Sequence, residues 1–127
     1  MMPGIRKDLA IGFDPALAKL PDALRSEGFG VLTEIDVSAT LKAKLGIEFR
    51  RYRILGACNP PLAHRALEAA LEIGIMLPCN VIVYERDDGG ATVVAIDPMQ
   101  TIAAQDPGLA PIAEEVRGRL ARVVAQL

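Results

Sequence analysis

The sequence predicts an α+β fold, a two-layer sandwich in which helices cover one face of a mostly antiparallel sheet. Five segments have strand patterning, and segments with helical spacing stand between and after them. Helices of this length can return the chain across a sheet, which predicts split β-α-β units. The 127 residues are 51% apolar and contain no repeat or linker, so we expect a single domain, residues 1–127.

The first half of the chain alternates between strand and helix patterns. Residues 5–13 are predicted as a strand and 14–27 as a helix, which Pro21 is expected to kink or split. Residues 29–37 alternate between the two faces of a strand, and 38–46 form a short helix ended by a glycine.

The second half supplies three strands and two helices. A strand over residues 49–58 leads into a strong helix over 60–74, which begins with two prolines. Strands over 78–85 and 91–97 are joined through Arg-Asp-Asp-Gly-Gly, a composition typical of a hairpin turn. An amphipathic C-terminal helix covers about residues 111–126.

The second sheet face carries opposite charges and aliphatic side chains. We expect Glu34 and Asp36 on one strand, and Arg51 and Arg53 on the next, to lie on the outward face and to stabilise each other. The last hairpin is apolar on both faces. Such a surface is expected to be covered, by the C-terminal helix or by a second copy of the chain, and we favour the homodimer.

Charge and hydropathy argue against two classes of partner. A formal charge of −2 and a pI near 5.4 do not provide the basic surface that nucleic acid requires. No segment reaches the roughly 18 apolar residues of a membrane span, and the N-terminus lacks the pattern of a secretory signal. We therefore expect a cytoplasmic protein without nucleic-acid or membrane partners.

The two cysteines, Cys58 and Cys79, stand at junctions between strands and helices. Cys58 precedes a helix N-terminus, which favours a thiolate and permits a nucleophile, a redox thiol or a soft-metal ligand. The favoured alternative is a small buried hydrophobe. If the intervening helix leads to a parallel strand, the two cysteines lie about 17–20 Å apart. That separation excludes a disulfide or a shared metal site within one subunit, but not a contact across a dimer.

Other polar residues have simpler interpretations. Asn59 is expected to cap the helix that follows it. His64 and Glu68 form an i, i+4 pair, which is more often a surface interaction than a base or a metal site. No zinc spacing, phosphate-binding loop, Ser-His-Asp set or paired-carboxylate motif is present, so no catalytic residue, cofactor or metal is predicted.

Two motifs, Gly-Ala-Cys-Asn-Pro at 56–60 and Leu-Pro-Cys-Asn at 77–80, lie in a longer stretch that resembles domain-of-unknown-function family 302. The resemblance is close over residues 28–98 and gives a family core of about 5–98, with the C-terminal helix outside it. It implies a small α+β fold of the TATA-binding-protein-like group, usually dimeric, with no established activity. The motifs make four residues the candidate ligand or thiol site: Cys58, Asn59, Cys79 and Asn80.

Two functions of different classes follow from these observations. The leading hypothesis is a small cytoplasmic, dimeric protein that binds a small-molecule ligand or serves as an accessory domain without catalysis. The alternative is a thiol-dependent enzyme, or a protein that handles a soft metal or a redox reaction through Cys58, with or without Cys79 of the partner subunit. A purely structural interaction module is a third possibility.

Overall fold

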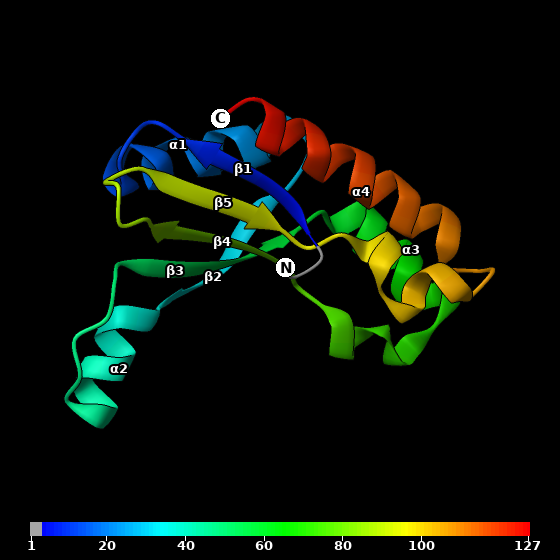
Figure 1. The fold of residues 1–127 in the computed structure, drawn as a ribbon. Coiled ribbons are helices and arrows are strands. Elements are labelled where there is room, and N and C mark those ends of the chain that lie inside the picture. Colours follow the sequence, from blue (N-terminus) through cyan, green and yellow to red (C-terminus); the bar gives the residue numbers. More distant parts are fainter. Residues whose placement is uncertain (1–3) are drawn as a thin grey trace.

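The computed structural model describes residues 4–127, which form the predicted two-layer α+β sandwich (Figure 1). The strands are β1 Ile5–Leu9, β2 Gly30–Asp36, β3 Tyr52–Cys58, β4 Cys79–Glu85 and β5 Ala91–Ala95. The α-helices are α1 Phe13–Ser26, α2 Val37–Leu45, α3 Pro60–Ala69 and α4 Ala110–Ala125. Short 3-10 helices are η1 Leu71–Met76, η2 Pro98–Gln100 and η3 Ile102–Gln105. Within residues 4–127, no helix is both long and apolar enough to cross a membrane.

The five strands form one sheet in the order β1-β5-β4-β3-β2, and every neighbouring pair is antiparallel. β1 and β2 therefore run in the same direction with three strands between them, which is a split β-α-β return through α1. The expected parallel return through α3 is wrong, because β4 lies antiparallel beside β3. In Figure 1, α3 and η1 lie beyond the end of the sheet, so the chain enters β4 at the end where it left β3.

The hydrophobic core lies between the sheet and the helices α1 and α4. The register aligns Leu55, Val81 and Ala95 across three strands, and all three side chains are buried. α1 is one helix that continues through Pro21, so of the two expected effects of this proline, a kink or a split, the split does not occur. Both helices bury large aliphatic side chains against this face: Leu20, Leu24, Leu120, Val123 and Val124.

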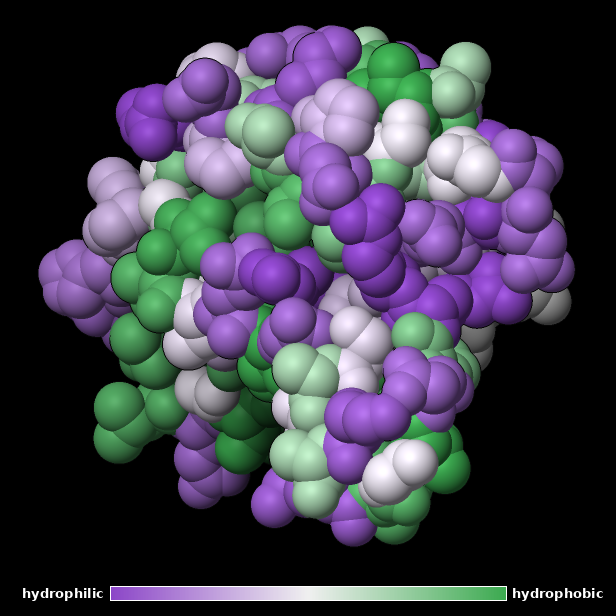
Figure 2. All heavy atoms as spheres, turned by 90° about the vertical axis from the view of Figure 1, so that its left-hand side faces the viewer, coloured by the Kyte–Doolittle hydropathy of each residue, from purple (hydrophilic) through white to green (hydrophobic). Residues whose placement is uncertain are grey.

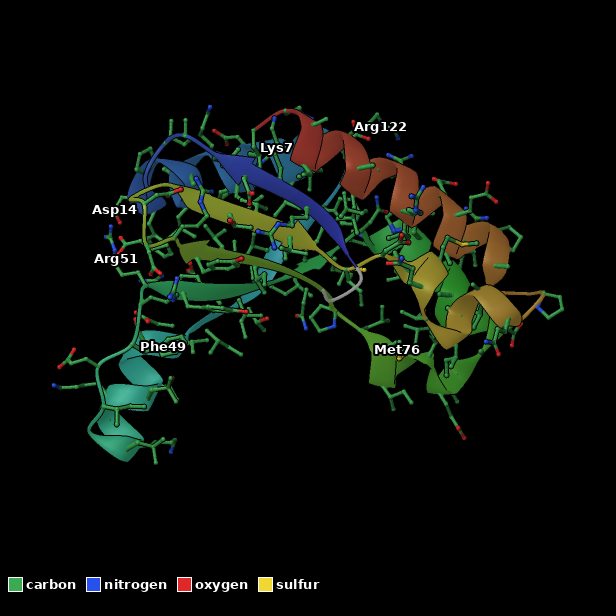
Figure 3. All side chains as sticks on the ribbon, in the orientation of Figure 1. Lys7, Asp14, Phe49, Arg51, Met76 and Arg122 are labelled. Carbon is green, nitrogen blue, oxygen red and sulfur yellow. The ribbon has the colours of Figure 1, made fainter. Side chains whose placement is uncertain are left out.

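Arg53 forms the expected ion pairs with the acidic residues of β2, but on the other face of the sheet, whereas Arg51 pairs with Asp14 and Glu85 instead. Arg53 pairs with Glu34 at 3.0 Å and with Asp36 at 3.3 Å. Because side chains alternate along a strand, Arg53 shares the helix-covered face with the buried residues of β3, so the expected outward placement is wrong. Arg51, just before β3, likewise reaches α1, where it pairs with Asp14 at 2.8 Å (Figure 3).

α4 packs against the core face of the sheet and not against the opposite face, which we call the open face. A row of aliphatic residues crosses four strands on this open face: Ile35, Ile54, Ile82 and Val94. Beside this row, the rings of Tyr52 and Tyr84 stack with centroids 5.7 Å apart. The last hairpin is therefore apolar on both faces, as predicted.

Residues 37–49, which we call the arm, project away from the sheet (Figure 1). Asp36 caps α2 by accepting a hydrogen bond from the Ala39 N–H at 3.0 Å, and Gly46 ends the helix with a φ of 67°. No residue of α2 is buried. Figure 2 faces this end of the molecule and shows apolar side chains exposed between charged ones. Three large apolar arm residues are 66%, 45% and 46% exposed: Leu45, Ile47 and Phe49.

Candidate functional site

Cys58 and Cys79 lie at the same end of the sheet. Ala57 of β3 pairs directly with Cys79 of β4, so Cys58, the next residue, is a near neighbour of Cys79. The expectation that they occupy opposite ends of parallel strands is wrong, because β3 and β4 are antiparallel. Both cysteines are free thiols.

The two cysteines line a two-lobed cavity at this end of the sheet, which we call the end cavity. Its larger lobe has a volume of about 70 Å³ and its smaller lobe about 50 Å³. Cys58 and Asn59 line the smaller lobe, and Met76 of η1 lines the larger one. Five residues line both lobes: Ala66, Leu77, Cys79, Ile112 and Val116. The end cavity is therefore walled by the start of β4, by α3, by α4 and by residues of the 3-10 helices, and it is partly open to solvent.

Cys79 packs against the hydrophobic core at this site. Burial raises the pKa of Cys79 from 9.0 to about 11, and the adjacent Cys58 adds a smaller increase. Since a thiolate is the nucleophilic form, Cys79 is held as a neutral thiol at physiological pH. In this form it behaves as a small apolar side chain within the cavity wall.

Asn59 has the predicted capping role and a second structural role. Its Oδ1 accepts a hydrogen bond from the Leu62 N–H at 3.3 Å, and its Nδ2 donates to the Glu27 carbonyl at 3.3 Å. Gly28 has a φ of 85°, and a Cβ added there would lie 2.8 Å from Asn59 Nδ2. The side chain of Asn59 thus fastens the start of α3 to the turn that follows α1.

Asn80 is separated from the other three candidate residues. It pairs with Gly56, and its side chain is exposed, whereas that of Cys79 faces the core. Its carbonyl accepts a hydrogen bond from the Ile96 N–H at 3.0 Å. The structure therefore brings together Cys58, Asn59 and Cys79, and not Asn80.

His64 forms the expected surface pair. Its Nε2 lies 2.8 Å from Glu68 Oε1, and the two side chains are 74% and 68% exposed. In the described part of the chain, residues 4–127, no group of three or more His, Cys, Asp and Glu side chains is arranged to hold a metal ion.

Much of the cavity wall was not identified from the sequence, because its residues belong to segments outside the cysteine motifs. Ile112, Ala113 and Val116 belong to α4. Met76 ends η1, and Thr101 lies between η2 and η3. The amphipathic pattern of α4 predicts that its apolar side is buried. To predict that these residues lie beside Cys79, one must know that α3 returns the chain to the same end of the sheet.

The fold and the end cavity define a small α+β domain with an apolar, partly open pocket beside two thiols. The chain belongs to the family described as Domain of unknown function DUF302, whose model matches residues 5–127 and so extends through α4. It is similar to a solved structure, "Crystal structure of uncharacterized conserved protein DUF302 from Bacillus stearothermophilus". That similarity has 32% sequence identity and a TM-score of 0.89, over 99% of this chain and 98% of the other. No curated protein matches the chain.

Proposed function

We propose that this protein is a small, dimeric, cytoplasmic domain that binds a small-molecule ligand, or serves as an accessory protein, without catalysing a reaction. The observation that supports binding is the end cavity, where the cysteines of both sequence motifs meet in an aliphatic wall. A concave, mostly apolar site with few polar groups is typical of ligand binding. The neutral state of Cys79 supports a role for this wall in packing rather than in chemistry.

The open sheet face supports assembly with a second copy of the chain. Ile54, Ile82 and Val94 are only partly buried, and Ile35 is 49% exposed. The Phe49 ring on the arm lies 6.4 Å from that of Tyr52, so the apolar arm is continuous with the sheet face. Contiguous apolar surface of this kind marks an interaction site. A symmetric dimer covers the same surface on both subunits.

Sedimentation equilibrium at micromolar concentrations tests the dimer. The wild-type chain should sediment as a dimer, and Ile82→Lys should sediment as a monomer with an unchanged far-UV circular dichroism spectrum. Ile102→Lys is the matched control, because Ile102 is 65% exposed outside the open face. A monomeric wild-type chain, or an Ile82→Lys variant that dimerises as well as the control, contradicts this surface.

Native mass spectrometry of the purified protein, followed by a thermal-shift screen of metabolites, tests ligand binding. A co-purifying small molecule, or a saturable rise in Tm with an added compound, is the expected result, because ligands that bind only the folded state stabilise it. If a broad screen gives neither a co-purifying molecule nor a rise in Tm, the binding role is contradicted. The accessory role, which needs no ligand, then remains.

The thiol-dependent alternative gains one argument from the antiparallel arrangement of β3 and β4. Cys58 and Cys79 of one subunit line the same lobe, so a dithiol reaction or a two-thiol soft-metal site needs no partner subunit. Titration with Ag⁺, a soft ion that prefers thiolate ligands, distinguishes the two proposals. Stoichiometric tight binding that both Cys58→Ala and Cys79→Ala abolish favours the alternative, whereas unchanged binding in either variant counts against it.

A further inference from the structure

The polar groups that line the end cavity are already engaged in hydrogen bonds. Both ends of the Asn59 amide are occupied, as described above. The Thr101 hydroxyl donates to the Pro98 carbonyl at 2.6 Å and accepts from the Ala103 N–H at 3.3 Å. Throughout residues 4–127, no buried side-chain nitrogen or oxygen lacks a partner. A ligand in this cavity therefore meets aliphatic surface and thiols, with no unpaired side-chain amide or hydroxyl.

Water is a poor occupant of such a space. An ordered water molecule makes about three hydrogen bonds, and water against this wall finds few polar partners. The charged form of a ligand would also lose its hydration without gaining an ion pair, because neither lobe is lined by Asp, Glu, Lys, Arg or His. An uncharged, apolar molecule replaces poorly hydrogen-bonded water by favourable contacts here.

The volume of the cavity limits the size of this molecule. One water molecule requires roughly 10–15 Å³ of such space. The larger lobe, at about 70 Å³, therefore accommodates a compact molecule of roughly five heavy atoms. Because five wall residues are common to both lobes, small movements of these side chains can extend the site into the smaller lobe.

The larger lobe adjoins a surface hollow beside η1 and η2. Met76 lines both the larger lobe and an adjoining surface hollow, which is also lined by Met99 and Ile102. Figure 3 places Met76 on η1, at the end of the molecule opposite the arm. Leu71 and Ile75 of the same segment are 83% and 82% exposed. Short 3-10 segments with few buried contacts open at low free-energy cost, and unbranched methionine side chains rearrange readily.

We propose that the end cavity binds a small, uncharged, apolar molecule, which enters past Met76. This inference rests on the proposed binding function and names its ligand class. The wall makes no use of hydrogen bonding for recognition, so size and the absence of polar groups determine which molecules bind.

Methyl NMR of the wild-type chain tests this inference with three probes: xenon, neopentane and tert-butanol. Neopentane and tert-butanol match in size and differ by one hydroxyl group. We expect xenon and neopentane to produce saturable shifts of the Ile73, Ile112 and Val116 methyl signals. tert-Butanol should bind at least about tenfold more weakly, because its hydroxyl group is buried without a partner. Equal affinity for the two isosteres, or no shift of the wall methyls, overturns the inference.

A pair of variants in α4 locates the binding. Ala113→Leu places a large side chain into the larger lobe and should abolish the shifts, whereas Ala125→Leu, at an exposed position of the same helix, should retain them. Ile73→Ala, which enlarges the same lobe, should bind neopentane more tightly and covers the case in which Ala113→Leu fails to fold. Unchanged affinity in both the filling and the enlarging variant overturns the inference.

The same spectra separate this inference from the proposed function. Probe shifts confined to Ile54, Ile82 and Val94 would assign binding to the open sheet face. That result overturns the end-cavity site but preserves a binding role for the protein. Failure of the broader metabolite screen, by contrast, counts against ligand binding as a function even if xenon enters the cavity.

Discussion

Cys79 should resist alkylation far more strongly than an ordinary cysteine. Iodoacetamide reacts with the thiolate, and the pKa of Cys79 is raised from 9.0 to about 11. At pH 8 this shift lowers the thiolate fraction from roughly 10% to roughly 0.1%, so the reaction should slow about 100-fold before any steric protection is counted. Quantitative peptide mass spectrometry over a range of pH, with the urea-unfolded chain as the reference, measures this ratio.

The same shift makes the stability of the protein depend on pH. The folded pKa lies above the unfolded value, so the stabilisation from burying the neutral thiol is complete below pH 9 and is lost as pH rises through about 11. A shift of this size corresponds to about 3 kcal/mol in the free energy of unfolding. Urea unfolding at pH 8 and pH 11 should therefore show a loss in wild type that exceeds the loss in Cys79→Ala by about 2 kcal/mol, because the folded thiol is half ionised at pH 11.

Two results would refute this account of Cys79. One is an alkylation rate at pH 8 that equals the rate in the unfolded chain while the protein remains folded. The other is an identical loss of stability at high pH in wild type and Cys79→Ala. Cys58→Ala provides the control for removing a neighbouring thiol from the same cavity.

Three further substitutions, and one control, test the packing, hydrogen bonds and ion pairs around the sheet end. Gly56→Ala should lower the free energy of unfolding by about 1–3 kcal/mol in urea titrations, because the added Cβ would lie 2.2 Å from Thr33 Oγ1 and 2.6 Å from a Pro78 carbon. Gly30→Ala, whose Cβ meets open space, should have an effect below about 0.5 kcal/mol, and equal losses would contradict the steric explanation. Asn59→Ala should cost about 1–2 kcal/mol through loss of the α3 cap, measured by thermal unfolding; a neutral substitution would show that the cap contributes little. Asp97→Asn should cost about 1–3 kcal/mol, because the 2.9 Å ion pair that joins buried Asp97 to α4 loses its charge, and a stability unchanged in high and low salt would refute that contribution.

Local sequence signals predicted the elements and caps well. Asn59 followed by two prolines predicts a helix start, and the structure has the side-chain cap at that position. Gly46 predicts a helix end, and it adopts the left-handed conformation there. Alternation in the last hairpin predicts its two apolar faces. Each of these features depends on residues within a few positions of one another.

The arrangement of the candidate site depended on distant contacts that local patterns do not specify. The ten residues of α3 are long enough for a parallel return, but α3 and η1 pack at the end of the sheet and bring Cys79 beside Ala57. The charges near Arg53 were assigned to the wrong face, because a strand pattern identifies two faces without saying which one the helices cover. The cavity wall formed by α4 likewise follows from tertiary packing.

The exposed apolar residues of the arm and the buried residues of the core form two separate sets in this fold. Residues 37–49 supply exposed apolar side chains, while no residue of α2 contributes to the buried core. Changes in the length or composition of the arm therefore alter what the molecule presents to its surroundings without altering what holds the sheet and helices together. Surface properties and stability can thus change largely separately in proteins built on this plan, because few substitutions in the arm need compensation in the core.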